Sequence, residues 1–309
     1  MTAISYTAIT ATGATDVSTT IDLAVLGGSG FYEMPGLEGV EEVAVETPFG
    51  LPSDVIRVGR LEGARVAFLA RHGRGHSLLP SELPQRANLW ALKSLGVRRV
   101  LAVSAVGSLR EDYQPGDMAV PDQLIDRTSG IRPSTFFGQG VVAHVGFAEP
   151  FCPVMREALL RAARLAGVSA HDGGAYVVIE GPAFGTRAES HLYRSWNASA
   201  VGMTALPEAK LAREAEICYA VLAAVTDYDA WHVGHEAVEA STVFEVLRQN
   251  VAHGREAVRQ LARQLPPEGG CGCGRTLDAA MVTAPESISA EARERLGPIL
   301  ARRLGEARA

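Results

Sequence analysis

Short apolar runs alternate with helical patterns along most of this chain, and the alternation limits the folds that are open to it. The run Asp22–Leu26 is closed by Gly27–Gly30, as expected for a buried strand that leads into a tight turn. Alternation of this kind predicts a mostly parallel sheet flanked by helices. The strand-like runs span 22–26, 65–70, 99–104, 117–121, 175–180, 200–203 and 218–225, and the helical patterns span 85–95, 154–166, 188–196, 208–214 and 242–265.

The pattern divides the chain into one main domain with a shorter segment at each end. Residues 1–20 are rich in Thr, Ala and Ser and lack the basic start and apolar run of a secretory signal, so we expect a flexible extension on a cytoplasmic protein. Residues 21–265 hold the alternating pattern and form the predicted domain. Residues 266–309 form a tail that consists of a Pro- and Gly-rich linker, Cys271-Gly-Cys273 and a charged helical segment. We expect this tail to pack on the main domain or on a partner subunit.

Composition excludes several classes of partner. The 309-residue chain carries 29 Lys and Arg against 35 Asp and Glu, and this net charge of -6 disfavours nucleic acid and anionic membranes as partners. No apolar run reaches the roughly 18 residues of a membrane span. Four cysteines in a chain of this length predict no disulfide framework, and we expect them to be reduced. Because the C-x-C pair by itself has too few ligands for zinc, we expect no metal.

Two segments that follow strand-like runs could hold an oxyanion. Gly27–Gly30 places a hydroxyl and flexible backbone amides at the end of a strand, although a plain strand-to-loop turn would account for it as well. Glu33 occupies the last glycine position of the dinucleotide fingerprint and argues against that function. The second segment, 71–76, contains two arginines and two histidines. Guanidinium groups match phosphate oxygens, and the alternative is a solvated basic turn.

Four further segments follow strand-like runs, at 104–108, 179–184, 201–208 and 226–229. The first is rich in small residues, which would let a ligand approach the backbone closely. The others could bring an aromatic face, a hydroxyl and two carboxylates to one cleft. Each has a structural alternative: Phe184 as a core residue, Met203 as a gap filler, and Asp227 and Asp229 as turn or capping residues.

The order and spacing of these motifs resemble the trimeric purine nucleoside phosphorylase family throughout residues 22–265. The resemblance rests on the series GGSG, ARHGRGH, SAVGSLR, AEPFC, EGPAF, VGMT-LPE and TDYD. It implies a single α/β domain with a mixed, partly barrel-like sheet flanked by helices. It also implies a homotrimer, or a dimer of trimers, with active sites near the subunit boundaries. Inorganic phosphate would be a co-substrate, and the enzyme would need no cofactor.

The resemblance assigns a role to each candidate site residue. Phe184 would pack against the purine, Met203 would border the ribose, and His144 would reach the 5′ side of the sugar in a neighbouring subunit. For His144 the alternative is a surface histidine in a loop. A helix at about 240–244 would line the 5′ pocket. The phosphate ligands would be Ser29, Arg71, His72, the backbone near Ala105, and Thr204, and the apolar 5′ residues would be Val243 and Phe244.

The base contacts favour an aminopurine. Relatives that act on 6-oxopurines carry an Asn where this chain has Asp227, and a Glu in the segment that matches 184–186, where this chain has Gly185. An ionised carboxylate accepts a hydrogen bond from an amino group at C6, whereas two acceptors would repel each other there. We therefore expect Asp227 to donate a proton to purine N7, with Asp229 sharing or orienting that proton.

The expected reaction is a pentosyl transfer, the phosphorolysis of 5′-methylthioadenosine to adenine and 5-methylthioribose 1-phosphate, in methionine and purine salvage. A phosphorylase with a broader or different 5′ preference, for adenosine or for 5′-deoxy- or 5′-haloadenosine, remains open, as does a 6-oxopurine enzyme. A nucleoside hydrolase and a nucleotide-binding module without activity are the rival classes. Relatives also carry a small hydroxyl residue at 185 and Asn at 202, where this chain has glycine.

Overall fold

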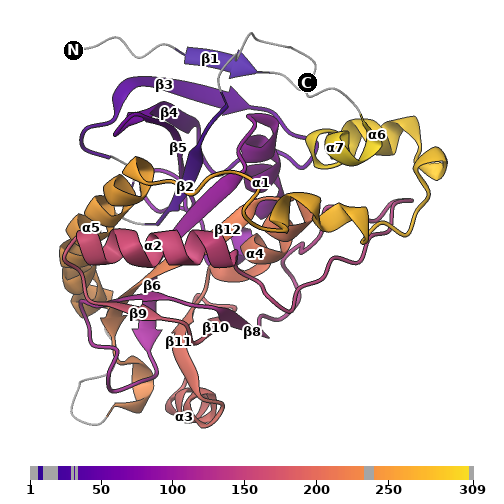
Figure 1. Ribbon diagram of the computed structural model, residues 1–309. Coiled ribbons are helices and arrows are strands. Elements are labelled where there is room, and N and C mark those ends of the chain that lie inside the picture. The colour runs from indigo at the N-terminus through magenta and orange to yellow at the C-terminus, as the bar shows by residue number, and fades with distance from the viewer. Residues whose placement is uncertain (1–5, 10–19, 29–30, 32–33, 233–239, 306–309) are drawn as a thin grey trace.

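The computed structural model describes residues 6–9, 20–28, 31, 34–232 and 240–305 (Figure 1). One twelve-stranded mixed sheet is covered by helices on both faces. The strands are β1 (Tyr6–Ile9), β2 (Leu23–Gly27), β3 (Glu38–Val45), β4 (Ile56–Leu61), β5 (Ala64–Ala70), β6 (Arg99–Ser108), β7 (Met118–Val120), β8 (Gln123–Arg127), β9 (Ala170–Asp172), β10 (Ala175–Ile179), β11 (Ala198–Gly202) and β12 (Cys218–Asp227). The α-helices are α1 (Gln85–Ser94), α2 (Pro153–Leu165), α3 (Arg187–Ser195), α4 (Ala205–Glu214), α5 (Ala240–Arg263), α6 (Ala290–Leu296) and α7 (Ala301–Leu304).

Strand β6 joins the two halves of the sheet. It pairs in parallel with β12 along nearly its whole length, from Arg99 to Gly107. On its other edge it pairs first with β2, in parallel, at 100–103 and then with β11, antiparallel, at 107–108. Strands β5, β4, β3 and β1 continue the sheet beyond β2, and β10 and β8 continue it beyond β11. The expectation of a mostly parallel, mixed sheet is therefore confirmed.

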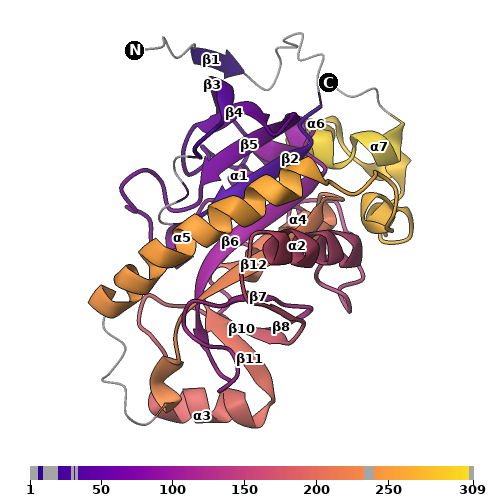
Figure 2. The same ribbon diagram turned by 60° about the vertical axis from the view of Figure 1, so that its left-hand side comes forward.

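The central strands are apolar on both sides because helices cover both faces of the sheet. Leu23 and Val25 of β2 pack with α2 and α5, whereas Ala24 and Leu26 pack with α1 and α4 on the opposite face. Helices α2 and α5 lie side by side in both views (Figures 1 and 2). Strands buried on both faces appear in the sequence as unbroken apolar runs, which is why the sequence predicts them well.

All seven predicted strands and all five predicted helices of the main domain are present, with boundaries within a few residues of those expected. The sequence did not indicate β1, β3, β4, β8 and β9. Strand β3 is rich in Glu and buried only near its end, and β9 has only three residues, so neither forms an apolar run. Within the predicted flexible extension, Tyr6–Ile9 forms β1 and pairs with β3, which differs from the expectation for that part of it.

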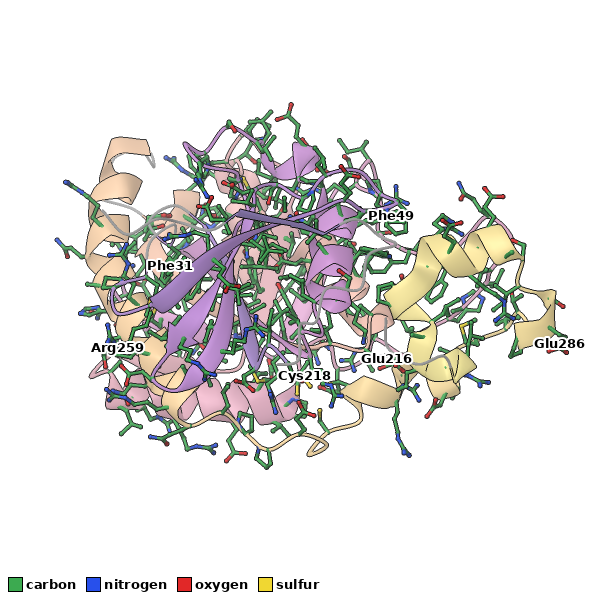
Figure 3. All side chains as sticks on the ribbon, turned by 90° about the horizontal axis from the view of Figure 1, so that it is seen from above. Phe31, Phe49, Glu216, Cys218, Arg259 and Glu286 are labelled. Atoms are coloured by element: carbon green, nitrogen blue, oxygen red, sulfur yellow. The ribbon has the colours of Figure 1, made fainter. Side chains whose placement is uncertain are left out.

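The tail packs on its own main domain, one of the two alternatives that the sequence left open. Leu277, Leu296 and Ile299 are buried in the same cluster as α1 and α4. The indole of Trp90 on α1 donates to the carbonyl of Arg295 at 3.2 Å. Glu216 lies on the side of the domain that faces the tail (Figure 3), and it accepts hydrogen bonds from Arg302 and from the backbone of Leu277. Among the described residues, no helix is long and apolar enough to cross a membrane.

Candidate active site

A crevice opens where β6 changes partner. On one edge of β6, β2 ends opposite Val103, and β11, which runs the opposite way, reaches Gly107. The carboxyl ends of β2 and β11 therefore point toward each other, and the edge at 104–106 pairs with neither strand. Ligands of α/β proteins bind at such carboxyl ends, because the strand order changes there and no strand fills the gap.

A pocket of ≈ 240 Å³ occupies this crevice. The stretch of β6 from Val103 to Gly107 forms its floor and covers roughly 13 Å at about 3.3 Å per residue. Further lining residues come from the segments after β2, β5, β10, β11 and β12 and from α5: Gly28, Phe31, Arg71, His72, His76, Phe184, Met203, Thr204, Thr226, Asp227, Asp229, Asn250 and Val251. Most site residues predicted from the sequence thus lie in one pocket.

Arg71, at the end of β5, is anchored at one end of this floor. Its guanidinium donates to both carboxylate oxygens of Glu208, at 2.8 and 3.2 Å, and to the carbonyls of Leu26 and Val103. Burial opposes the charge of Arg71, but Glu208 holds its pKa above the ordinary value. Four hydrogen bonds use four of its five N–H donors, so one N–H is left for a ligand. Arg71 is thus mainly a positioned structural cation.

His72 is a buried neutral imidazole rather than a second cation. Its Nδ1 lies 2.9 Å from the carbonyl oxygen of Leu78, and because a carbonyl can only accept, Nδ1 carries the proton. Burial lowers the pKa of His72 to about 4. The ring stacks on His76 with the ring centroids 4.3 Å apart. At neutral pH, Nε2 is therefore a hydrogen-bond acceptor.

Two hydroxyls and a stretch of β6 backbone that pairs with neither β2 nor β11 complete this end of the pocket. Thr204, which follows β11, donates to Ser104 of β6 at 3.1 Å, and both side chains are buried. Ala105 lies beside them on the unpaired edge of β6 and is exposed to the pocket. Gly28 also lines this end, whereas Ser29, a predicted phosphate ligand, lies outside the described residues.

Asp227 ends β12 at the opposite end of the floor, where it pairs with Gly107. Its Oδ2 lies 2.7 Å from the hydroxyl of Thr226, and its Oδ1 accepts from the backbone N–H of Asp229 at 2.8 Å. Burial raises the pKa of Asp227 above its ordinary value, and these hydrogen bonds oppose the rise only in part. This carboxyl is therefore easier to protonate than an exposed one.

Asp229 brings a second carboxyl close to the first. Burial raises the pKa of Asp229, and the neighbouring Asp227 raises it further. Its backbone has φ +52°, a left-handed conformation that Asp adopts more readily than most residues. At Gly107 a Cβ would lie 3.0 Å from Oδ1 of Asp227 and 3.1 Å from Cβ of Asp229, so only glycine lets both residues approach β6 this closely.

The aromatic wall and the segment beside it come from the loops after β10 and β11. Phe184 lines the pocket and is 53% exposed, so its ring presents a free face rather than belonging to the core. Met203 lines the pocket beside it. Buried Arg132 ties the two loops together, because it donates to the carboxylate of Glu180 at 2.5 Å and to the carbonyl of Met203 at 2.7 Å.

The predicted 5′ helix and His144 contribute to the pocket differently from what the sequence predicted. The helix that lines the pocket is α5, and the described residues of α5 that reach the lining are Asn250 and Val251, about two turns beyond the predicted stretch. The side chains of Val243 and Phe244 lie outside the described residues. His144 is exposed and is absent from the lining of its own chain's pocket.

Sequence reasoning missed several residues that shape the pocket. Asn250 is buried and donates to the carbonyl of Val225, and its Oδ1 has no partner among the described residues. The hydroxyl of Tyr176 fills the space beside Gly202, where a Cβ would lie only 2.3 Å from it. The tyrosine at 176 therefore requires a residue without a side chain at position 202. No local motif marks Asn250 or Tyr176, because Asn250 lies within an amphipathic helix and Tyr176 within an apolar strand.

The sequence of this chain is similar to that of known enzymes over most of its length. A sequence model of the Phosphorylase superfamily matches residues 22–265. The chain is 56% identical over 280 residues to the S-methyl-5′-thioadenosine phosphorylase of Chloroflexus aurantiacus, with 91% of this chain and 97% of that protein covered. It is 52% identical over 278 residues to the protein of the same name from Geobacter sulfurreducens, with 90% and 97% covered.

Solved structures agree with the sequence comparison. A methylthioadenosine phosphorylase from an antarctic soil metagenomic library superposes with a TM-score of 0.85 at 49% identity, covering 91% of this chain and 99% of that one. A methylthioadenosine phosphorylase from Schistosoma mansoni in complex with adenine gives a TM-score of 0.73 at 39% identity, covering 79% and 91%. Both similarities extend well beyond the pocket, over most of each chain.

Proposed function

Because the chain belongs to the phosphorylase superfamily, we propose that it cleaves 5′-methylthioadenosine with inorganic phosphate, giving adenine and 5-methylthioribose 1-phosphate. The observation that carries the proposal is the pocket itself. Hydrogen-bond donors around Arg71 lie at one end of the β6 floor, and the Asp227 and Asp229 pair lies at the other, roughly 13 Å away along the strand. A nucleoside with a phosphate beneath its sugar spans this distance.

Phosphate binds at the Arg71 end. Because Glu208 offsets the charge of Arg71, the anion is held by the remaining N–H of Arg71, by the hydroxyl of Ser104, to which Thr204 donates, and by the backbone after β2. Nε2 of neutral His72 accepts a hydrogen bond from the P–OH group of monohydrogen phosphate. The phosphate then attacks C1′ as the bond to the base breaks, and its charge stabilises the cationic sugar.

Adenine leaves from the carboxylate end. Phe184 offers a free face to the purine, and Asp227 gives a proton or a strong hydrogen bond to N7 while Asp229 accepts from the C6 amino group. The raised pKa values of both carboxyls support this division of roles, because one proton shared by the pair relieves the repulsion between them. Met203 borders the ribose.

The 5′ substituent occupies the part of the pocket beside α5. Phe31 and Val251 are apolar and suit a methylthio group better than a hydroxyl, which would lose a partner there. We assign Val243 and Phe244 to the same wall. His144 of a neighbouring subunit closes the 5′ side in a homotrimer, and its exposure in the single chain supports this assignment.

The test is release of the free base, adenine from 5′-methylthioadenosine and adenosine or hypoxanthine from inosine and 5′-methylthioinosine, each with and without inorganic phosphate. Strict dependence on phosphate with 5′-methylthioadenosine ahead is the expected result. Cleavage without phosphate would make the protein a hydrolase, and binding without cleavage would make it a nucleoside-binding module. Faster cleavage of inosine or 5′-methylthioinosine would overturn the roles of Asp227 and Asp229, and equal rates with adenosine would overturn the 5′ preference.

A further inference from the structure

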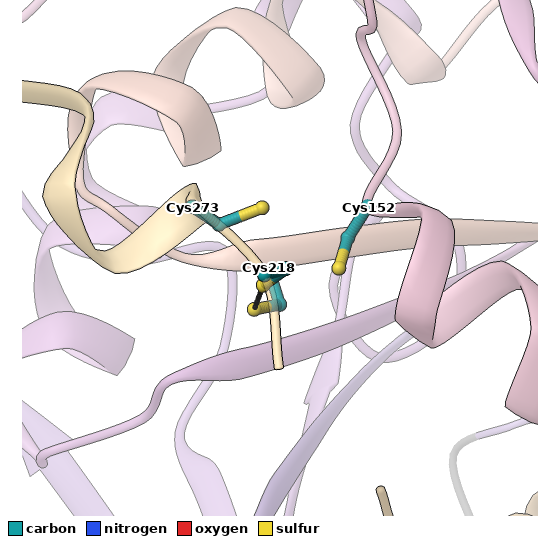
Figure 4. Close-up of side chains that lie close together, drawn as sticks. Cys152, Cys218 and Cys273 are labelled. Carbon is teal, nitrogen blue, oxygen red and sulfur yellow. Dashed lines mark hydrogen bonds between the residues drawn. The ribbon is translucent and has the colours of Figure 1, made fainter. Parts of the chain in front are cut away.

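Four cysteines from three distant segments of the chain converge outside the active site. Cys152 precedes α2, Cys218 starts β12, and Cys271 and Cys273 belong to the tail. Their Sγ atoms all lie within 4.8 Å of one another, and those of Cys218 and Cys271 are 3.3 Å apart (Figure 4). Among the cysteines, the expectation of no metal considered only the Cys271 and Cys273 pair, and the fold adds two more thiols to that pair.

The spacing suits a tetrahedral metal. Zinc bound by four thiolates has Zn–S bonds of about 2.3 Å, which place the sulfurs about 3.8 Å apart. The four sulfurs come from three separate segments, as in structural zinc sites. All four cysteines of the chain take part in the cluster. Two of them are buried and two half-buried, so a metal here would be shielded from water.

The surroundings favour thiolates. Cys152 is the N-cap of the 13-residue helix α2, where the backbone N–H groups carry partial positive charge. The guanidinium of Arg213 lies 3.8 Å from Sγ of Cys273 and can donate to it. A zinc ion with four thiolates carries a charge of −2, and these neighbours offset it.

We propose that Cys152, Cys218, Cys271 and Cys273 bind one structural zinc ion, which fastens the tail to the main domain. Binding converts four thiols to thiolates and releases four protons, and no oxidation takes place. Half of the ligands belong to the domain and half to the tail, so the ion cross-links the two parts of the chain.

The tail in turn holds the loop that carries His144. The backbone N–H of His144 donates to the carbonyl of Ala280 at 2.8 Å, and Ala143 forms a bridge with Met281. The N–H of Val142 donates to the hydroxyl of Thr283. The zinc ion therefore supports the position of this loop through the tail that it fixes, which is a structural role and not a catalytic one.

The experiment measures metal and thiols together. The full chain is purified with a tag that contains no histidine and without metal-affinity resin, and zinc per chain is measured by plasma mass spectrometry. Thiols are counted after denaturation with a chelator and without reductant. We expect about one zinc ion and all four thiols per chain. Disulfides in place of zinc, or reduced protein that takes up no added zinc, would overturn the proposal.

Two substitutions at one half-buried position separate zinc from disulfide chemistry. Cys271→Ser removes a ligand, and we expect zinc content and the unfolding temperature to fall. Cys271→His supplies an imidazole, which binds zinc but forms no disulfide, so zinc and most of the stability should return. Ser287→Ala, an exposed change in the same tail, serves as the matched control and should alter neither. Unchanged zinc in Cys271→Ser, or failure of Cys271→His to bind it, would contradict the assignment.

Discussion

The hydroxyl of Thr226 lies in contact with two acceptors but has one proton. Its Oγ1 is 3.2 Å from the carbonyl oxygen of Val106 and 2.7 Å from Oδ2 of Asp227. When Asp227 is ionised, the hydroxyl can satisfy only one of them. When Asp227 is protonated on Oδ2, the carboxyl donates to Oγ1 while the hydroxyl donates to Val106. Thr226 can therefore form a hydrogen bond with Asp227 in either protonation state of that carboxyl.

Asp227→Asn should lose most of kcat and keep or raise stability. The amide fits both contacts, because its oxygen accepts from the N–H of Asp229 and its NH₂ donates to Thr226. A raised pKa in the folded state means that the wild-type carboxyl costs stability as the pH rises through that pKa. The stability difference in favour of Asn should thus be largest at neutral pH and shrink toward pH 4. Unfolding temperatures over this range and single-turnover rates measure both effects, and near-normal turnover would contradict the role.

His72 should make the protein sensitive to mild acid. Its folded pKa of about 4 lies below the ordinary value of 6.5, so the unfolded chain binds more protons between these values. The contribution of His72 to stability is therefore complete above pH 6.5 and is lost as the pH falls toward 4. His72→Gln should flatten this part of a denaturation profile against pH. A profile with the same slope in both proteins would show that His72 is not responsible.

Gly202 and Tyr176 should behave as one unit. Gly202→Ala places a methyl group against the Tyr176 hydroxyl, and overpacking of this kind costs roughly 1–3 kcal/mol. Tyr176→Phe removes a buried hydroxyl that has no hydrogen-bond partner among the described residues, so it should cost little by itself. The double variant should recover part of the loss, because the ring atoms Cζ and Cε2 still lie 3.0 and 3.1 Å from the new methyl group. A double-mutant cycle in urea tests this coupling, and simple additivity would refute it.

At the scale of secondary-structure elements, Arg71 joins parts of the fold that are distant in the sequence. It contacts the end of β2 through Leu26, β6 through Val103 and α4 through Glu208. Glu208 also accepts from the hydroxyl of Tyr219 on β12 at 2.7 Å. Since these elements surround the crevice, the ion pair at the proposed phosphate end of the pocket also sets the spacing of its walls.

Glu208→Gln should therefore destabilise the fold as well as weaken phosphate binding. Breaking a buried ion pair leaves an uncompensated charge and costs roughly 3–5 kcal/mol. Replacing Arg71 and Glu208 together by Met and Leu should restore much of that stability, because no charge is left unpaired, but it should not restore activity. Urea denaturation combined with the KM for phosphate separates the two effects. A stable single variant with a normal KM would refute this role for the ion pair.

At the scale of the whole molecule, the proposed active site needs more than one chain. His144 is exposed, lies outside the pocket of its own chain and is held by the tail. In a ring of three, each subunit would give this residue to one neighbour and receive it from the other.

Mixing two inactive variants tests this arrangement. Asp227→Asn and His144→Ala should each reduce activity when alone. In mixed oligomers formed by refolding the two together, some sites pair an intact Asp227 with an intact His144 from the neighbour, so activity should return in part. No recovery from mixed trimers, or a monomeric mass in solution, would contradict the shared site. Wild type refolded with His144→Ala provides the control for refolding losses.

The sequence by itself determined the main strands and helices, because buried strands and amphipathic helices leave apolar patterns within a few consecutive residues. It also determined which loops bear the pocket, since polar and small residues follow strands that end at the same edge. The tertiary structure alone decided that Glu208 neutralises Arg71, that Tyr176 excludes a side chain at 202, and that four cysteines meet. Each of these depends on contacts between segments far apart in the chain, and such contacts leave no pattern in the local sequence.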